Sequence, residues 1–390
     1  MDRTQRLLAA IMLVSVATAA CSAAAQPSWT WAPDDGTGAR QTGTPRPTEA
    51  PAGSASPAGG DPSSDPNAGG DPSPDANAGT TAATYYPRDP RAPARLAGTT
   101  HDIDLVVEER NNTVADGFVR QVWTFGGTVP GPVIRVQVGD TIRIHLINRP
   151  ATPLRAVAIG HPPVNNASHS VGFHASMVAP NDQMTSIKPG EEKTVEFKAE
   201  YAGVWMYHCE TEPVLQHIAN GMYGMVIVEP EGGLGRIDQE FFFVQSEWYL
   251  GGGNPLRPPT PSLAKAAAAA PAPDFVVFNG IADQYLDHPI QVETGKRVRA
   301  FILDAGPNID SSFHIEGTIF DRVIKEGIEL KVGNEGSWGS QAVDLSPGQG
   351  AIVEFTMAED GLYPIVTHAF NFVGRGALGL FQAGDGDPPN

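Results

Sequence analysis

Short runs in which apolar and polar residues alternate dominate the chain from about residue 101 onward. These runs, bounded by Gly and Pro, cover residues 101–109, 119–125, 133–148 with a break at Gly139 and Asp140, 194–198, 204–208 and 222–229. No stretch of useful length shows a helical period. Period-two alternation with Gly and Pro turns is typical of β-sandwiches and barrels. We therefore expect an all-β protein whose first domain, residues 98–231, is a Greek-key β-sandwich.

A second β unit, residues 274–390, reads as a diverged copy of the first. A Pro-Gly pair stands eight residues before a strand phenylalanine in both units, at Phe197 and at Phe355. Tyr207-His208-Cys209 also corresponds to Thr367-His368-Ala369 in the second unit, where alanine stands in place of the cysteine. The chain is therefore expected to hold two tandem sandwiches. Residues 232–273 are expected to connect them, with a Phe-rich strand at residues 240–249 followed by a Gly/Pro/Ala-rich passage at residues 251–273.

The N-terminal region has the pattern of an exported protein. Residues 1–25 combine an early positive charge, an apolar run too short to span a membrane and then small residues, which is typical of a signal sequence. Thr18-Ala19-Ala20-Cys21 resembles a bacterial lipobox, although Thr is a poor choice at its first position, so Cys21 is a candidate for acylation, and cleavage after Ala25 is the alternative. Residues 26–97 are rich in Pro, Gly, Ser and Asp and are expected to form a disordered linker. The expected location is the outer face of the cytoplasmic membrane, the periplasm or the cell surface, with a lipid anchor if Cys21 is acylated.

The net charge and the number of cysteines reduce the number of functions that the protein could have. A formal net charge of −18 and the lack of any basic stripe argue against a nucleic-acid partner. The chain has only 2 cysteines, so after processing Cys209 has no disulfide partner within the chain. A lone thiol in an oxidising compartment needs another reason to be present, and metal ligation is one.

The segment from Cys209 to Met222 carries the strongest chemical signal. His217 follows the cysteine by eight residues and Met222 follows His217 by five. Two imidazoles, a thiolate and a weak axial thioether form the ligand set of an electron-transfer copper site. The second imidazole is expected from an earlier strand, where His169 and His174 are the candidates. The alternative is that Cys209 is an ordinary buried thiol of the core.

Strand alternation predicts a second metal site. His169 and His174 are five residues apart, and His208 adjoins Cys209, so each pair is expected to point to opposite faces of its strand. If His169 and Cys209 face one metal, His174 and His208 face another. His368, the repeat equivalent of His208, is the expected third imidazole. A three-imidazole site with an open position can bind water or a small anion.

These residues, with Gly221-Met222-Tyr223-Gly224 and the turn Gly127–Pro132, resemble the two-domain cupredoxin proteins of the multicopper oxidase family, above all the copper-containing nitrite reductases. The resemblance covers residues 101–382. It implies a homotrimer with about two copper ions per chain. The implied type 1 copper ligands are His169, Cys209, His217 and Met222. The implied type 2 ligands are His174 and His208 of one chain and His368 of the next.

The resemblance also implies a reaction, in which a small redox donor supplies the electron for reduction of nitrite to nitric oxide. Two departures concern proton handling, because the family has an aspartate where this chain has Gly172 and a catalytic histidine where it has Ile319. A reaction that consumes protons needs an acid-base group, and His314 and Glu316 are the candidates here. Two alternatives remain open at this point. One is a laccase-like multicopper oxidase that uses oxygen, although the chain lacks the His-x-His pairs of such enzymes. The other is a non-enzymatic surface protein that transfers electrons through copper.

Overall fold

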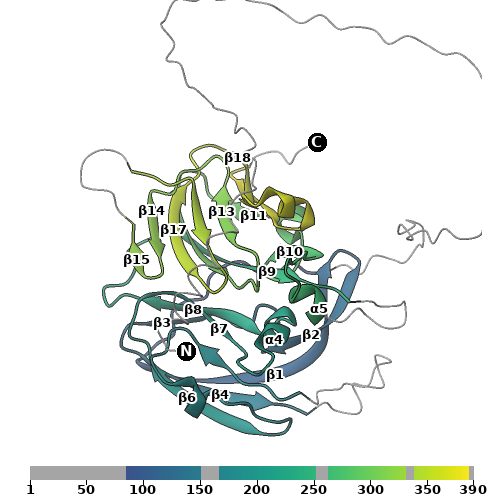
Figure 1. Cartoon of the computed structure of the whole chain (residues 1–390). Helices are drawn as coiled ribbons and strands as arrows, with labels where there is room; N and C mark the ends of the chain where they lie inside the picture. The colour runs from purple at the N-terminus through teal and green to yellow at the C-terminus, as the bar shows by residue number, and fades with distance from the viewer. Residues whose placement is uncertain (1–84, 151–166, 252–261, 331–337, 386–390) are drawn as a thin grey trace, which may run out of the picture. The chain divides into compact units, whose positions relative to one another are not determined.

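The computed structural model describes residues 85–150, 167–251, 262–330 and 338–385. The expected signal sequence, Cys21 and the linker as far as residue 84 lie outside these ranges. Within them the regular secondary structure is mostly β-sheet with a few short helices, which confirms the all-β class (Figure 1). None of the helices in the described ranges is apolar and long enough to cross a bilayer.

The N-terminal sandwich consists of two four-stranded sheets with the orders β2-β1-β4-β6 and β3-β8-β7-β5. Their bounds are β1 Thr100–Ala115, β2 Phe118–Phe125, β3 Ile134–Gln137, β4 Thr141–Asn148, β5 Gly172–Phe173, β6 Glu192–Lys198, β7 Gly203–His208 and β8 Tyr223–Glu229. Strand β4 shows why the sequence forms this layer, because Ile142, Ile144 and Leu146 are buried while the residues between them are partly exposed. Among the described residues of this sandwich, α3 at Pro180–Gln183 and α4 at Val214–Ala219 are short helices.

The C-terminal sandwich pairs a six-stranded sheet, β10-β9-β12-β17-β14-β15, with a five-stranded sheet, β11-β19-β18-β13-β16. Its strands are β9 Gln239–Trp248, β10 Phe275–Phe278, β11 His288–Val292, β12 Arg297–Asp304, β13 Ser311–Ile315, β14 Arg322–Lys325, β15 Ile328–Glu329, β16 Ala342–Leu345, β17 Gly350–Thr356, β18 Gly361–Thr367 and β19 Leu378–Ala383. Short helices lie at α5 Leu263–Ala266, α6 Gln284–Asp287 and η1 Phe370–Arg375.

Strand β9 falls within residues 232–273, which the sequence suggested were a connection. It pairs with β12 in parallel and with β10 in an antiparallel register, so it belongs to the C-terminal sandwich. Its side chains from Phe241 to Trp248 are all buried, since one face packs inside that sandwich and the other faces the N-terminal domain. A strand buried on both faces has no polar alternation to mark it.

The expected linker also ends earlier than residue 97. Residues 85–97 pack along both sandwiches, where the Ala92 amide donates to the Glu240 carbonyl (3.0 Å) and the Leu96 amide donates to the Arg135 carbonyl (2.9 Å). Arg88 donates to the carbonyls of Pro130 and Gly131. The two amide bonds satisfy part of the backbone, and the Arg88 guanidinium anchors the segment to the N-terminal sandwich, although its composition alone gives no reason for it to be ordered.

The two sandwiches share a core and an ion-pair network. Val204 and Met206 of β7 belong to the same buried cluster as Phe301 and Ile352 of the C-terminal sandwich. The Glu240 carboxylate lies between two arginines, at 2.7 Å from Arg135 and 2.7 Å from Arg299. Because these guanidinium groups are almost fully buried, each needs its carboxylate partner.

Candidate metal centre

The end of β7 and the loop after it bring Cys209, His217 and Met222 together. The chain leaves β7 after His208, forms the short helix α4 and returns through Gly221 into β8. Two backbone bonds close this loop, from the Cys209 amide to the Met222 carbonyl (3.1 Å) and from the Met222 amide to the His217 carbonyl (3.1 Å). Gly221 is required at the turn, because its φ is +111° and a Cβ there would lie 2.6 Å from a Val129 methyl carbon.

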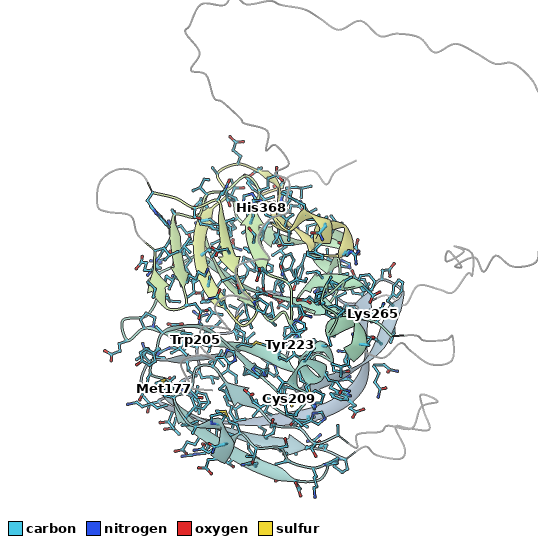
Figure 2. All side chains as sticks on the ribbon, in the orientation of Figure 1. Met177, Trp205, Cys209, Tyr223, Lys265 and His368 are labelled. Atoms are coloured by element: carbon cyan, nitrogen blue, oxygen red, sulfur yellow. The ribbon has the colours of Figure 1, made fainter. Side chains whose placement is uncertain are left out.

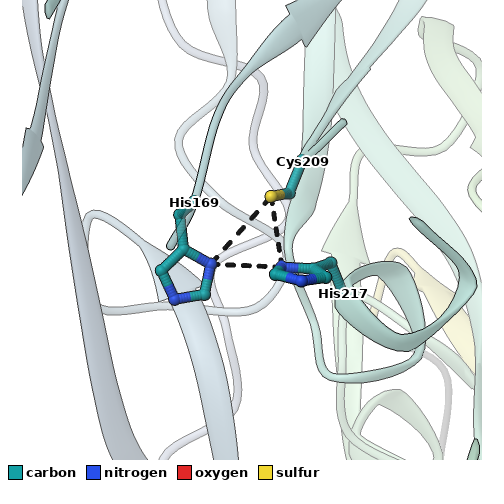
Figure 3. Close-up of side chains that lie close together, drawn as sticks. All are labelled: His169, Cys209 and His217. Carbon is teal, nitrogen blue, oxygen red and sulfur yellow. Dashed lines mark hydrogen bonds between the residues drawn. The ribbon is translucent and has the colours of Figure 1, made fainter. Parts of the chain in front are cut away.

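Three donor atoms converge beside this loop (Figure 3). The Nδ1 atoms of His169 and His217 are 3.1 Å apart, and the Cys209 Sγ lies 3.2 Å from His217 Nδ1 and 4.0 Å from His169 Nδ1. In the described part of the chain these three residues are the only group of His, Cys, Asp or Glu whose ligand atoms cluster this closely. Two metal–imidazole bonds of about 2.0 Å to one ion would place the nitrogens about this far apart.

The protonation states of the His169 and His217 imidazoles favour metal binding. All three are buried, with His169 and Cys209 at 0% exposure. Burial lowers the pKa of His169 to about 3, with a further contribution from His217, and lowers the pKa of His217 to about 4. Both imidazoles are therefore neutral at neutral pH and keep a lone pair for a ligand. Burial also raises the pKa of the Cys209 thiol, so a bound cation would be needed to hold it as thiolate.

Two residues that sequence reasoning missed support this cluster. The Trp123 ring packs against both imidazoles, with centroids 5.2 Å from His169 and 4.9 Å from His217. The Ser170 amide donates to the Cys209 sulfur at 3.4 Å. Ser170 could have been suspected because it follows His169, whereas nothing near Trp123 in the sequence points to the site.

Met222 is fully buried and belongs to the same core cluster as Cys209. Its backbone bonds both to Cys209 and to His217. It therefore lies on the loop that carries two of the three clustered donors.

A second pair of imidazoles lies on the other side of β7. The Nε2 atoms of His174 and His208 are 3.1 Å apart. His208 Nδ1 lies 3.0 Å from the Cys209 carbonyl, to which only an N–H can bond. This bond places the proton on Nδ1 and leaves the Nε2 lone pair facing His174. His208 is buried and His174 is exposed, so the pair opens onto the surface of the chain.

His368 lies elsewhere in the same chain. It is on the C-terminal sandwich, well separated from Cys209 (Figure 2), and its ring packs against His314 at a centroid distance of 4.5 Å. His314 Nδ1 also contacts the Gln341 carbonyl, and Glu316 is exposed on the same sandwich. Within one chain the structure therefore joins His174 to His208 and His314 to His368, but it does not join the two pairs.

Glu109 gives a pH-dependent prediction for the surroundings of the cluster. It is the cross-strand partner of Trp123, and burial raises its pKa from 4.5 to about 7, a shift that hydrogen bonding to Trp123 only partly offsets. Between about pH 4.5 and pH 7 the folded state therefore holds a proton that the unfolded state has lost. We expect the free energy of unfolding to fall as the pH rises through this range. When the pH is raised from 5 to 8, the urea concentration at the midpoint of unfolding should decrease more for the wild type than for Glu109→Gln. Equal changes in both proteins would contradict the prediction.

Comparison with known proteins identifies the family. Residues 106–233 match the sequence model of a family described as multicopper oxidase. A copper-containing nitrite reductase of Neisseria meningitidis is 35% identical over 309 residues, which cover 78% of this chain and 74% of the relative. The structure is similar to a copper nitrite reductase of Nitrosomonas europaea, with a TM-score of 0.62, 32% identity and coverage of 73% of this chain and 94% of that one. It is also similar to a solved multicopper oxidase, with a TM-score of 0.60, 26% identity and coverage of 76% and 94%.

The match to the nitrite reductase relative covers most of this chain, and the His169–His217 pair, the His174–His208 pair and Cys209 lie within a fold of the same kind. The chain therefore belongs to the family of copper-containing nitrite reductases.

Proposed function

We propose that the protein reduces nitrite to nitric oxide with one electron and two protons. In this proposal His169, Cys209, His217 and Met222 would hold a type 1 copper. His174 and His208 hold a type 2 copper. When bound, copper supplies one-electron redox chemistry at both positions.

One observation carries the proposal, namely that adjacent residues of one strand end face two different histidine-lined sites. Cys209 Sγ lies 3.2 Å from His217 Nδ1, while His208 Nε2 lies 3.1 Å from His174 Nε2. The His208 Nδ1–H also bonds back to the Cys209 carbonyl. An electron can therefore pass between the sites along one peptide unit and along this hydrogen bond.

The residues around each site would perform distinct tasks. Trp123 shields the His169 and His217 rings from water. The Ser170 amide bonds to the sulfur and holds it in place. The exposure of His174 leaves room for a small anion such as nitrite to approach.

We propose that the third imidazole of the type 2 site, His368, comes from a neighbouring chain in a homotrimer. The wide separation of His368 from Cys209 within one chain supports this arrangement (Figure 2). The partner chain would also bring His314 and Glu316 near the site as acid-base candidates. Sedimentation equilibrium of the copper-loaded protein tests this assembly, and a stable monomer would overturn it.

We further propose that the protein is exported and receives electrons from a small redox donor. The sequence of residues 1–25 supports export, and the lipobox-like stretch supports acylation of Cys21. Mass spectrometry of the mature N-terminus distinguishes a lipid-modified Cys21 from cleavage after Ala25.

The activity is tested by an anaerobic assay of the copper-loaded protein with nitrite and a reduced donor. We expect nitric oxide to form at a rate that a copper chelator abolishes. If the loaded protein forms no nitric oxide, the proposed activity is wrong, although the fold and the family would stand. Four-electron reduction of oxygen has less support, because the sequence has no His-x-His pair for a trinuclear cluster.

A further inference from the structure

The Glu210 side chain lies against the second pair of imidazoles. Its Oε1 is 3.5 Å from His208 Nε2, the nitrogen that also faces His174. Its amide donates to the Ser170 hydroxyl at 3.0 Å, which fixes the backbone at this point. The side chain is 34% exposed, so the carboxylate contacts His208 and is also accessible to solvent.

The carboxylate reaches this position because Gly172 has no side chain. Gly172 in β5 is the cross-strand partner of His208. A Cβ at residue 172 would lie 2.2 Å from Glu210 Oε1 and 2.6 Å from Glu210 Cγ. These distances are far below van der Waals contact. A side chain at residue 172 and the observed position of the Glu210 carboxylate therefore exclude each other.

We propose that Glu210 contacts the anion that reacts beside His174 and His208, and that Gly172 provides the space for its carboxylate. This inference rests on the proposed nitrite reduction. In that reaction nitrite takes up one electron from the donor and two protons, one N–O bond breaks, and the departing oxygen leaves as water. Glu210 accepts a hydrogen bond from the protonated oxygen and so orients the bond that breaks. A charge-assisted hydrogen bond of this kind is stronger than one between neutral groups.

Four variants of the copper-loaded protein test the role of Glu210 in turnover. Glu210→Gln and Glu210→Ala should lower kcat for nitrite by about 100-fold, as expected when a charge-assisted hydrogen bond to the departing oxygen is lost. KM should change by less than kcat, because the contact tightens as the oxygen becomes protonated. Gly172→Ala should lower kcat by a similar factor, because the new methyl group displaces the carboxylate. Glu212→Gln, which neutralises an exposed carboxylate on the same loop, is the matched control and should keep wild-type kcat.

The double variant Gly172→Ala/Glu210→Ala shows whether Gly172→Ala lowers kcat only by displacing the Glu210 carboxylate or also by disturbing the site in another way. If Gly172 acts only by accommodating Glu210, the double variant should be no slower than Glu210→Ala alone. Additive losses would show that Gly172→Ala harms the site independently, and would overturn the assignment of Gly172. Full kcat in Glu210→Gln would overturn the assignment of Glu210.

A second readout does not depend on turnover. In the oxidised protein without a donor, nitrite should change the electron paramagnetic resonance spectrum of the type 2 copper. We expect the change to be the same in the wild type and Glu212→Gln and to differ in Glu210→Ala. If the wild type forms no nitric oxide but this spectral difference is found, nitrite reduction is wrong and the contact between Glu210 and the anion stands. Identical nitrite-induced changes in all three proteins would overturn that contact.

Discussion

Replacing Cys209 by alanine should abolish the intense visible absorption of the copper-loaded protein and leave it folded. That absorption arises from charge transfer between thiolate sulfur and copper, and Cys209 is the cysteine at the buried cluster with His169 and His217. The bound copper should fall from about two ions per chain to about one, because the other imidazole pair does not use the thiolate. The loss in folding stability without metal should be small, about 1–2 kcal/mol, since free cysteine packs as a small apolar residue.

Visible absorption and metal analysis of the purified variant provide the measurement. Ser170→Ala is the matched control, because the Ser170 contact closest to the sulfur is made by the backbone amide and survives the substitution. The control should remain coloured. An unchanged visible spectrum in Cys209→Ala would show that the thiolate is not a copper ligand.

Replacing His174 by alanine should impair nitrite turnover without removing the colour of the copper-loaded protein. The visible absorption should persist, because the His169, Cys209 and His217 cluster is untouched. Nitrite turnover should fall by at least about 100-fold, because one of the three imidazoles proposed to hold the type 2 copper is lost. This result separates an enzyme from a protein that only transfers electrons through its type 1 copper.

His145→Ala is the control for this experiment. His145 lies on β4, is partly exposed and pairs with Asp104 and Glu192 rather than with any candidate ligand. Its removal should leave both colour and turnover unchanged. Wild-type turnover in His174→Ala would contradict the type 2 assignment.

The sequence predicted the strands well where one face is buried and the other is not. The alternation in β4 is an example, because Ile142, Ile144 and Leu146 fill the core while the intervening residues face water. It also predicted the strand at residues 240–249, which is β9, but placed it in the connection between the sandwiches, because a strand buried on both faces lacks the alternation that shows which side packs on a core. It failed at residues 85–97, because their order comes from hydrogen bonds to distant carbonyls that composition does not reveal.

The candidate metal residues were predictable to the extent that they are close in sequence or related by strand geometry. The spacing of Cys209, His217 and Met222 pointed to one loop, and the structure gathers them there. Trp123 was not predictable, because it comes from a strand of the other sheet. Glu210 could have been noticed, since it is two residues after His208 and such residues share a face when a strand continues.

The close approach of the two sandwiches has a consequence for any attempt to shorten the protein. Gly350 lies so near the Val204 carbonyl that a Cβ there would be 2.3 Å from it, and Val204 and Met206 are buried against the C-terminal half. A truncated variant that kept only the copper–thiolate half would expose this apolar surface to water and leave Arg135 without its Glu240 partner. A minimal blue protein made from this chain would therefore need a redesigned, polar outer face on β7 and β8 before it could remain in solution as a monomer.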